Sequence, residues 1–349
     1  MEHLIADYLR EEWSKTGWLH KNQHGFRNGF SCESQIISLS QDIADALDVG
    51  MTVDAIVIDF SKAFDLVPHD ILIKKLSTTG IDKRVVLWIR EFLFNRTQRV
   101  RIDSMFSKET DITSGVAQGS VLGPLLFLAY INDLPQHICS NIRLFADDCV
   151  IYRIIHDNRD KIALPEDLDK IHDWVVENEM KINAEKSKII SFNRSRNREH
   201  RSYHLNSFII PEKDTVKYLG ITLSSDLNWA THVTNTTRKA WKSLNFVKRI
   251  LKNGSNVETK SLAYTSLIRP VLEYASAAWD PYKKGQINEL QRIQRKALKF
   301  INLGGNHNNL LAIESLEVRR KRARLGCLFK AVKNEPAWRD IQERIGGSL

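Results

Sequence analysis

Short apolar runs alternate with amphipathic stretches over roughly the first 225 residues of the chain. The run VDAIVID (53–59) is apolar and β-branched and ends on a carboxylate, which predicts a buried strand with Asp59 at its edge. DKRVVLWIREFLF (82–94) has apolar positions at helical spacing behind an aspartate cap, so it predicts a helix. SVLGPLLFLAYINDL (120–134) is apolar on nearly every side and predicts a buried helix with Pro124 in its first turn.

Further strands and one more helix are predicted in the same part of the chain. QRVRID (98–103) and KSKIISF (186–192) are typical of strands. An amphipathic pattern predicts a helix from Pro165 to about residue 180. The alternating segment TVKYLGITL (215–223) predicts a single strand that forms a hairpin with SFIIP (207–211).

From about Asp226 onward the pattern predicts helices only. These are AWKSLNFVKRIL (240–251), KSLAYTSLIRPVLEYA (260–275), INELQRIQRKALKFI (287–301) and a last one around VRRKRARLGCLFKAVK (318–333). We therefore expect an α+β body followed by an all-helical module, with the boundary between Leu223 and Trp229.

The charge of the chain is concentrated at one end. The 349 residues have a formal net charge of +9, with 51 Lys and Arg against 42 Asp and Glu. The segment from Trp241 to Leu349 contains 21 Lys and Arg against 9 Asp and Glu, whereas the first 240 residues contain 30 against 33. A basic surface is expected of a polyanion-binding protein, because each neutralised phosphate releases condensed counterions. A solvated basic helix face is the alternative interpretation.

The length of the apolar stretches and the spacing of the cysteines indicate the cellular compartment. The longest apolar stretch, VLGPLLFLAYI (121–131), is shorter than the roughly 18 to 20 residues needed to span a bilayer, and the start MEHLIADYLREEW has no signal-peptide pattern. We expect an intracellular protein of the cytoplasm or nucleus with no membrane partner. The 4 cysteines form no CxxC pair, so we expect reduced thiols rather than a disulfide framework or a zinc site.

Two adjacent carboxylates, Asp147 and Asp148, lie between the apolar runs IRLF and CVIY in the segment FADD (145–148). These runs predict a strand pair that turns at the two aspartates. A plain surface hairpin is the usual explanation for such a turn, but here both flanks are apolar and a strand-borne carboxylate, Asp59, precedes them. Carboxylates at a sheet rim repel one another unless a divalent cation neutralises them, and magnesium is the obvious candidate. Two such ions about 4 Å apart serve in-line phosphoryl transfer, which is polymerase or nuclease chemistry.

Six sequence blocks, in order between about Gln23 and Leu223, resemble the reverse transcriptase domain of non-LTR (LINE-type) retrotransposons. AIVIDFSKAFDLVPHDILIKKL, GVAQGSVLGPLLFLAYINDLP and FADDCVIY are similar to the first, second and third catalytic motifs of that family of transposable elements, with Phe145 where many relatives carry Tyr. MKINAEKSKIISF resembles the motif that follows, KYLGITL the primer-grip strand and QHGFRNGFSCESQI the fingers segment. The tail around RPVLEYASAAWDPY resembles the thumb.

The resemblance implies an α+β fold: a right-hand polymerase palm and fingers with a C-terminal all-helical thumb. We expect partial fingers in residues 1–50, the palm with the remaining fingers elements in 51–225, and a basic helical thumb with a C-terminal extension in 226–349. Relatives carry an Arg-Pro-Ile-like fingers strand and an endonuclease domain upstream of the point that corresponds to MEHLI. We therefore expect an N-terminally truncated member of the family.

The resemblance also implies the roles of the acidic residues. Asp59, Asp147 and Asp148 correspond to the catalytic triad and metal ligands, with Asp59 and Asp147 as the direct ligands of two Mg²⁺ ions; Mn²⁺ is the alternative ion. Lys186 corresponds to a lysine near the pyrophosphate leaving group, where its charge or proton would assist departure. Without the family, Lys186 is an ordinary solvated lysine.

Four further residues correspond to substrate-binding positions of the family. Phe64 corresponds to the bulky ring that excludes a ribose hydroxyl and so selects deoxynucleotides. Gln118 and Gly119 correspond to the pair that lines the nucleotide and template pocket, where a larger side chain than glycine would crowd the base pair. Arg27 corresponds to a contact with template or triphosphate. Taken alone, Phe64 is a core aromatic residue and Gln118–Gly119 an ordinary helix-entry turn.

The function that the resemblance implies is that of an RNA-directed DNA polymerase, a nucleotidyltransferase. Its partners would be an RNA template, a DNA primer and dNTPs, and the RNA–DNA duplex would be recognised by shape and phosphate geometry. A catalytically inactive nucleic-acid-binding fragment with the same fold is the alternative. An RNA-dependent RNA polymerase is a third interpretation, against which Phe64 argues.

Overall fold

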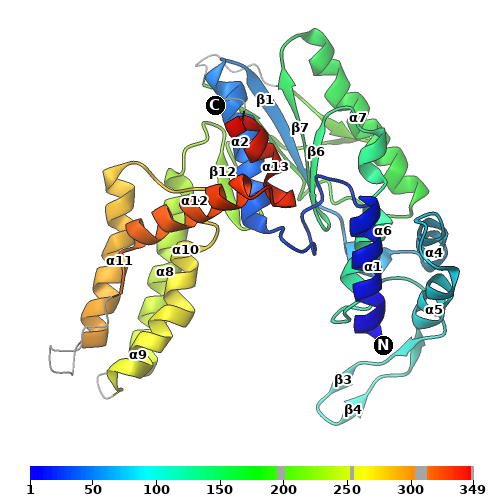
Figure 1. Cartoon of the computed structure of the whole chain (residues 1–349), viewed down its shortest axis with the longest axis horizontal. Helices are drawn as coiled ribbons and strands as arrows, with labels where there is room; N and C mark the ends of the chain where they lie inside the picture. The colour runs from blue at the N-terminus through cyan, green and yellow to red at the C-terminus, as the bar shows by residue number, and fades with distance from the viewer. Residues whose placement is uncertain (195–200, 252–254, 303–312, 347–349) are drawn as a thin grey trace. The chain divides into compact units, whose positions relative to one another are not determined.

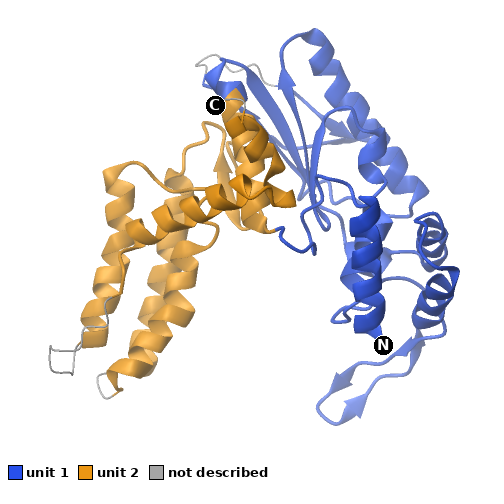
Figure 2. Cartoon of the chain, viewed as in Figure 1, with its two compact units in different colours: residues 1–30, 46–213 blue, residues 31–45, 214–349 orange. Residues whose placement is uncertain are grey.

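The structure is a computed structural model that describes residues 1–194, 201–251, 255–302 and 313–346 (Figure 1). It combines helices with antiparallel strands, so the predicted α+β class is confirmed. The chain divides into two compact units: residues 1–30 with 46–213 form unit 1, and residues 31–45 with 214–349 form unit 2 (Figure 2). No helix in the described ranges has both the length and the apolar content to cross a bilayer. All four cysteines are free.

Unit 1 contains the larger sheet. In chain order its elements are α1 (Glu2–Thr16), β1 (Thr52–Ile58), α3 (Ala63–Leu66), α4 (His69–Ser77), α5 (Lys83–Leu93), β2 (Thr97–Gln98), β3 (Arg101–Ile102), β4 (Met105–Phe106), β5 (Thr110–Asp111), α6 (Gly123–Ile131), η1 (Leu134–His137), β6 (Asn141–Phe145), β7 (Asp148–Ile155), α7 (Asn158–Glu177), β8 (Lys188–Phe192), β9 (His204–Leu205) and β10 (Phe208–Ile209). The four-stranded sheet has the order β6-β7-β1-β8, and all its neighbours are antiparallel.

The core of unit 1 joins this sheet to its helices. Apolar side chains of α1, α4, α5, α6 and α7 pack in one buried cluster with those of β1, β6 and β7. The predicted helix α6 is buried on nearly every side and has Pro124 in its first turn, as expected. Pro124 is tolerated there because the first backbone N–H groups of a helix have no intrahelical partner. The predicted cap of α5 is also confirmed, since the Asp82 carboxylate accepts from the backbone N–H of Arg84.

Unit 2 is mainly helical. Its elements are most of α2 (Cys32–Asp48), followed by β11 (Thr215–Tyr218), β12 (Ile221–Ser224), α8 (Ala230–Leu251), α9 (Val257–Ala263), the π-helical segment η2 (Tyr264–Ile268), α10 (Arg269–Glu273), α11 (Lys284–Asn302), α12 (Leu316–Val332), η3 (Pro336–Trp338) and α13 (Arg339–Gly346). The predicted all-helical module after residue 226 is therefore confirmed for the described residues.

The two units divide the chain differently from the predicted ranges 1–50, 51–225 and 226–349. The first part of α2 belongs to unit 2, where the Glu33 carboxylate accepts from the backbone N–H of Ala277 at 3.2 Å and Gln35 donates to the Tyr218 hydroxyl at 3.2 Å. The hairpin β11–β12 also belongs to unit 2 rather than to the α+β body. Fingers, palm and thumb remain predicted names for these parts.

Four local predictions were wrong. The segment 98–103 is not one strand, because β2 ends at Gln98 and β3 begins at Arg101. The turn in FADD is formed by Ala146 and Asp147, because Asp148 already pairs with Phe145 as the first residue of β7. Helix α7 begins at Asn158 rather than Pro165, because Asp157 and Asp160 form a capping box. The segment 215–223 is not one strand: it turns at Leu219 (φ 44°) and Gly220 (φ 80°), so β11 pairs with β12 instead of with SFIIP.

Candidate active site

The three predicted acidic residues meet at one end of the four-stranded sheet. Asp59 directly follows β1, whose last residue pairs with Cys149, so Asp59 lies beside Asp148 at the start of β7. Asp147 occupies the second position of the adjoining turn. Asp59 and Asp147 are half-buried, whereas Asp148 is exposed. Burial, together with the negative charge of Asp59, raises the pKa of Asp147, so these two carboxylates lie within electrostatic range of each other.

The donor set at this end of the sheet fits a hard divalent cation. Within the part of the chain that the structure describes, no three or more His, Cys, Asp or Glu side chains are already grouped so as to hold a metal ion. The pair Asp59 and Asp147 nevertheless has the right chemistry, because Mg²⁺ prefers carboxylate oxygens and is usually bound by one or two of them. A bound cation would also stabilise the charged form of Asp147, whose pKa is raised by burial and by the charge of Asp59.

A turn at residues 183–187 fixes the backbone of Asp59. The Asn183 N–H donates to the Asp59 carbonyl at 2.8 Å, and the Asp59 N–H donates to the Ser187 hydroxyl at 3.2 Å. That hydroxyl donates in turn to the Asn183 carbonyl at 2.9 Å. Lys186 belongs to the same turn, where its N–H donates to the Asn183 side chain at 3.1 Å, and its own side chain is exposed. The structure thus brings the backbone of Lys186 next to that of Asp59.

Gln23 stabilises the turn that carries Asp147 through a hydrogen bond to the turn backbone. The carbonyl oxygen of the buried Gln23 side chain accepts from the backbone N–H of Ala146 at 2.9 Å and from that of Gly25 at 2.8 Å. Ala146 has a φ of 55°, an uncommon conformation for a residue other than glycine, and such positions need support from their surroundings. Gln23 was not predicted as a site residue. Only its place inside the block QHGFRNGFSCESQI pointed to it, because its contact with Ala146 spans 123 residues.

The backbone around Gln23 adds an extra edge to the sheet. The His24 N–H donates to the Leu144 carbonyl at 2.8 Å, and the Leu144 N–H donates to the Asn22 carbonyl at 3.0 Å, which makes a short parallel pairing with β6. Gly25 packs directly on the turn: a Cβ at this position would lie 2.3 Å from the nitrogen of Ala146. A side chain at Gly25 would therefore displace the turn that carries Asp147.

Phe64, five residues beyond Asp59, belongs to an aromatic cluster. Its ring stacks on Phe127 with 4.4 Å between centroids, and it meets the ring of Phe26 edge-on at 6.3 Å. The Phe64 carbonyl accepts from the backbone N–H of Val116 at 2.8 Å. The ring is half-buried, so these contacts fix its orientation while part of it stays accessible. The selection of deoxynucleotides by Phe64 stays a prediction.

The loop with Gln118 and Gly119 is anchored on two sides. The Gln118 side chain donates to the Asp65 carboxylate at 2.8 Å, and the Val121 N–H donates to the carboxylate of Glu2 at 2.9 Å. Gly119 has a φ of 81°, and a Cβ at this position would meet no other described atom within 4 Å, so the backbone conformation already accounts for glycine here. The contact of Gln118 with Asp65 was not predicted from the sequence.

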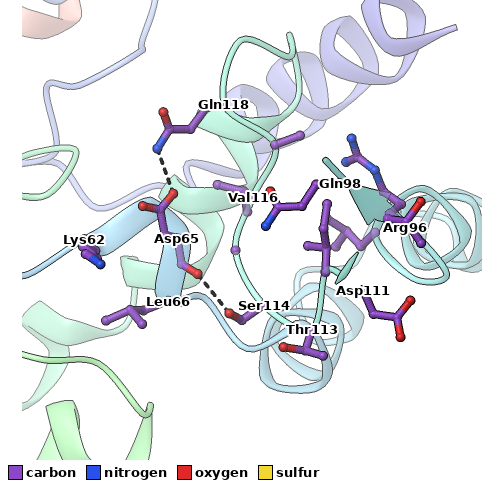
Figure 3. A pocket seen from close by; sticks show the side chains of 15 residues that line it. Lys62, Asp65, Leu66, Arg96, Gln98, Asp111, Thr113, Ser114, Val116 and Gln118 are labelled. Atoms are coloured by element: carbon purple, nitrogen blue, oxygen red, sulfur yellow. Dashed lines mark hydrogen bonds between the residues drawn. The ribbon is translucent and has the colours of Figure 1, made fainter. Parts of the chain in front are cut away.

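Beside this loop the structure has an open cavity of about 780 Å³. Figure 3 shows Gln118 and Asp65 on one side of it and Arg96 and Gln98 on the other. Asp59, Asp147 and Asp148 do not line it. The cavity therefore adjoins the Gln118 loop rather than the carboxylates.

Arg27 has a structural role in the turn before α2. Its guanidinium donates to the carbonyls of His20 and Gln23, both at 3.0 Å, and lies 4.2 Å from the centre of the Phe30 ring. Burial lowers the pKa of Arg27. These contacts tie Arg27 to the segment that supports the Ala146 turn, and a contact with template or triphosphate stays a prediction.

A family model described as reverse transcriptase (RNA-dependent DNA polymerase) matches residues 1–223, more than half of the chain. The chain belongs to this family. Reverse transcriptases use divalent metal ions, in keeping with the carboxylates at the end of β1. The matched range ends within β12 and includes every predicted site residue.

Relatives of this reverse transcriptase domain come from non-LTR retrotransposons, as the sequence predicted. The chain is 29% identical over 315 residues to the probable RNA-directed DNA polymerase from transposon BS of Drosophila melanogaster, covering 86% of this chain and 34% of that protein. It is 28% identical over 315 residues to the RNA-directed DNA polymerase from mobile element jockey of the same organism, with the same coverage. The chain thus spans about a third of the length of these relatives.

Solved structures give a weaker likeness. A telomerase of Candida tropicalis in complex with a fragment of telomeric RNA has a TM-score of 0.47 and 10% identity, covering 93% of this chain and 56% of that one.

Proposed function

We propose that the chain is the polymerase part of a non-LTR retrotransposon reverse transcriptase and extends a DNA primer on an RNA template. The primer 3′-OH attacks the α-phosphorus of a dNTP, the new P–O bond forms, and the bond to pyrophosphate breaks. Two divalent ions, when bound, would stabilise both the attacking and the leaving oxygen. Asp59 and Asp147 would hold these ions, with Asp148 beside them.

The observation that carries the proposal is the position of Asp59 next to the Asp147 turn. The two residues are far apart in the sequence, yet the charge of Asp59 contributes to the raised pKa of Asp147. Two half-buried carboxylates that repel each other are costly for a folded protein without a cation, and such sites are typical of function. Membership of the reverse transcriptase family supports the same chemistry.

The other site residues would serve the substrates. The ring of Phe64, oriented by Phe127, would lie against C2′ of the incoming sugar and exclude a ribose hydroxyl. The loop with Gln118 and Gly119 would line the nucleotide and template pocket, and the hydrogen bond from Gln118 to Asp65 would fix its position. Lys186, exposed beside Asp59, would reach the leaving pyrophosphate. A contact of Arg27 with template or triphosphate would compete with the hydrogen bonds from its guanidinium to the carbonyls of His20 and Gln23.

The basic helices of unit 2 would hold the RNA–DNA duplex through phosphate contacts that ignore sequence. Helices α11 and α12 supply many of the cations. In α11 the basic residues Arg292, Arg295, Lys296 and Lys299 lie on the exposed face, whereas α12 is exposed over most of its length and its Arg320 is buried. Binding of primer–template should therefore weaken linearly in a plot of log affinity against log salt concentration. A flat response would contradict this role of unit 2.

Primer extension on poly(rA)/oligo(dT) with Mg²⁺ and dTTP tests the proposal. We expect extension by the wild-type chain and none by Asp147→Ala. Binding of primer–template without any extension by the wild type would instead identify a catalytically inactive binding fragment. Phe64→Ala should admit ribonucleotides, and unchanged discrimination between dTTP and UTP would remove the proposed role of Phe64.

A further inference from the structure

A two-stranded arm, residues 95–112, connects α5 to the loop before α6. It consists of β2 paired with β5 and β3 paired with β4, with Thr97 opposite Asp111 and Arg101 opposite Phe106. In Figure 1 the β3–β4 end of this arm extends beyond α5, away from the four-stranded sheet. From β2 to the tip, about six residues at ~3.4 Å each give a reach of roughly 20 Å.

One face of the arm joins arginines to an aromatic ring. The guanidinium of Arg99 lies 4.9 Å from the centre of the Phe106 ring and that of Arg101 lies 5.6 Å from it. Phe106 is 54% exposed. Neither arginine takes part in an ion pair with another described residue, and Arg101 is oriented by donating to the Asp103 carbonyl at 2.8 Å. The face therefore offers two charged planar groups and one ring to solvent.

The other face of the arm is apolar and equally accessible. Val100, Ile102 and Met105 are 63%, 70% and 74% exposed. Ile102 pairs with Met105 and Arg101 pairs with Phe106, so the two pairs lie on opposite faces of the arm. Val100 lies between Arg99 and Arg101 in the segment before β3. Both faces of the arm are therefore exposed to solvent. The arginine face does not pack against the core of unit 1.

The base of the arm opens on the cavity beside the Gln118 loop. Arg96, Gln98 and Asp111 line one side of this cavity, and Gln118 lines the other (Figure 3). Arg96 also lies 5.3 Å from the centre of the Phe92 ring, which gives a second pairing of arginine with an aromatic ring at the base. A strand of nucleic acid that follows the arginine side of the arm would therefore arrive at the Gln118 loop.

We propose that this arm binds the single-stranded part of the template RNA before it pairs with the primer strand. Unpaired bases stack on aromatic rings and on guanidinium planes, and arginine also neutralises phosphates, so the Arg99–Phe106–Arg101 face matches a single strand. A duplex keeps its bases stacked inside and cannot use the Phe106 ring in this way. The proposal rests on the proposed function, because the strand is taken to be the template.

Equilibrium binding of a labelled, unstructured RNA of about 16 nucleotides tests the arm without primer, dNTP or metal. In the full chain, Arg99→Ala combined with Phe106→Ala and Arg101→Ala should weaken binding by about tenfold or more. The slope of log affinity against log salt should also fall by about 1.4, or ~0.7 for each lost phosphate contact. Arg84→Ala, which removes another exposed arginine of unit 1, is the matched control and should leave both quantities unchanged.

Two further variants separate stacking from charge. Arg99→Lys with Arg101→Lys keeps the charge and should preserve the salt slope while weakening binding. Phe106→Leu keeps an apolar side chain and should weaken binding without changing the slope. An unchanged affinity in the triple variant, or an equal loss in Arg84→Ala, would overturn the proposal.

Primer extension distinguishes a failure of the arm from a failure of the proposed function. On a template with an overhang of about 2 nucleotides, which is too short to reach the tip, arm variants should extend the primer as the wild type does. On an overhang of about 12 nucleotides they should extend it more slowly. Wild-type chain that never extends a primer contradicts the proposed function, whereas arm variants that match the wild type on both templates contradict the arm.

Discussion

Two aspartates, Asp54 in β1 and Asp59 just past its end, lie in opposite electrostatic environments. Asp54, 1% exposed, accepts from the Ser191 hydroxyl at 2.7 Å, from the Tyr203 hydroxyl at 2.5 Å and from the Arg201 guanidinium at 2.7 Å. Asp59, just past the other end of the strand, is half-buried and lies within the electrostatic range of a second carboxylate, Asp147. One carboxylate is neutralised by the protein, and the other adds to a local excess of negative charge.

This difference indicates that the carboxylate of Asp54 has a structural role, whereas that of Asp59 belongs to the candidate active site. A buried charge is tolerated only where partners compensate it, as at Asp54. Half-buried carboxylates that repel each other lower stability unless something outside the chain compensates their charge. The comparison therefore predicts that substitutions at the Asp54 end change stability and that substitutions at the Asp59 end change activity.

The largest effect is expected for activity at the Asp59 end. Asp59→Asn or Asp147→Asn should lower the rate of primer extension by roughly a thousandfold. Each variant loses a ligand of a metal ion that stabilises the transition state by several kcal/mol. The melting temperature should not fall. Asp173→Asn, at an exposed position of α7, is the matched control and should keep full activity. A marked loss of melting temperature in both site variants would contradict the assignment.

At the other end of β1, Asp54→Asn should lower the free energy of unfolding by about 3 to 5 kcal/mol, since it removes a buried charge that accepts hydrogen bonds from Ser191, Tyr203 and the largely buried Arg201. Urea denaturation measures this loss. Asp48→Asn breaks an exposed ion pair with Arg194 in the same unit and should cost less than about 1 kcal/mol. Equal losses in the two variants would show that the Asp54 cluster is no more important than a surface pair.

Substitution of Gln23, which supports the Asp147 turn, should have an intermediate effect on the rate of primer extension. Gln23→Met keeps the approximate shape of the side chain but removes the acceptor of two backbone N–H groups, so extension should slow by about tenfold as the Asp147 turn shifts. Gln23→Glu keeps an acceptor oxygen and should be closer to the wild type. Affinity for primer–template should not change in either variant. If Gln23→Met extends primers at the wild-type rate, the turn does not depend on this contact.

The smallest effect is a pH-dependent gain in stability at the Asp59 end. The folded-state pKa of Asp147 is raised above its ordinary value of 3.8, so its charged form destabilises the folded chain. Stability from this group is present at low pH and is lost as pH rises through the raised pKa. Asp147→Asn should therefore melt at a higher temperature than the wild type at neutral pH, and the difference should vanish on acidification. A lower melting temperature at neutral pH would contradict the view that burial and the charge of Asp59 make the charged form of Asp147 unfavourable.

Local patterns predicted much of unit 1. The β-branched run of 53–59, the Asp82 cap and Pro124 in the first turn of α6 are each decided by neighbouring residues, and the structure has them as expected. The start of α7 was missed because Pro165 was taken as a helix start, although Pro165 lies inside the helix and the capping box at Asp157 precedes it. That signal was present in the sequence.

Long-range contacts could not be predicted from local patterns. Gln23 and Ala146 are 123 residues apart in the sequence, and the residues around them do not predict the hydrogen bond between them. The membership of α2 in unit 2 depends on equally distant contacts, such as that of Glu33 with Ala277. The family resemblance identified the carboxylates, whereas the residues that hold them in place required the fold.

The most direct test is to count the ions that the carboxylates bind. Mn²⁺ binding, followed by electron paramagnetic resonance of the free ion, is measured on the complex with an RNA template, a dideoxy-terminated primer and the next dNTP. The wild-type complex should take up two ions that the Asp59→Asn/Asp147→Asn double variant does not, with primer–template binding unchanged. Identical Mn²⁺ binding by the two proteins would contradict the assignment of Asp59 and Asp147 as the metal site.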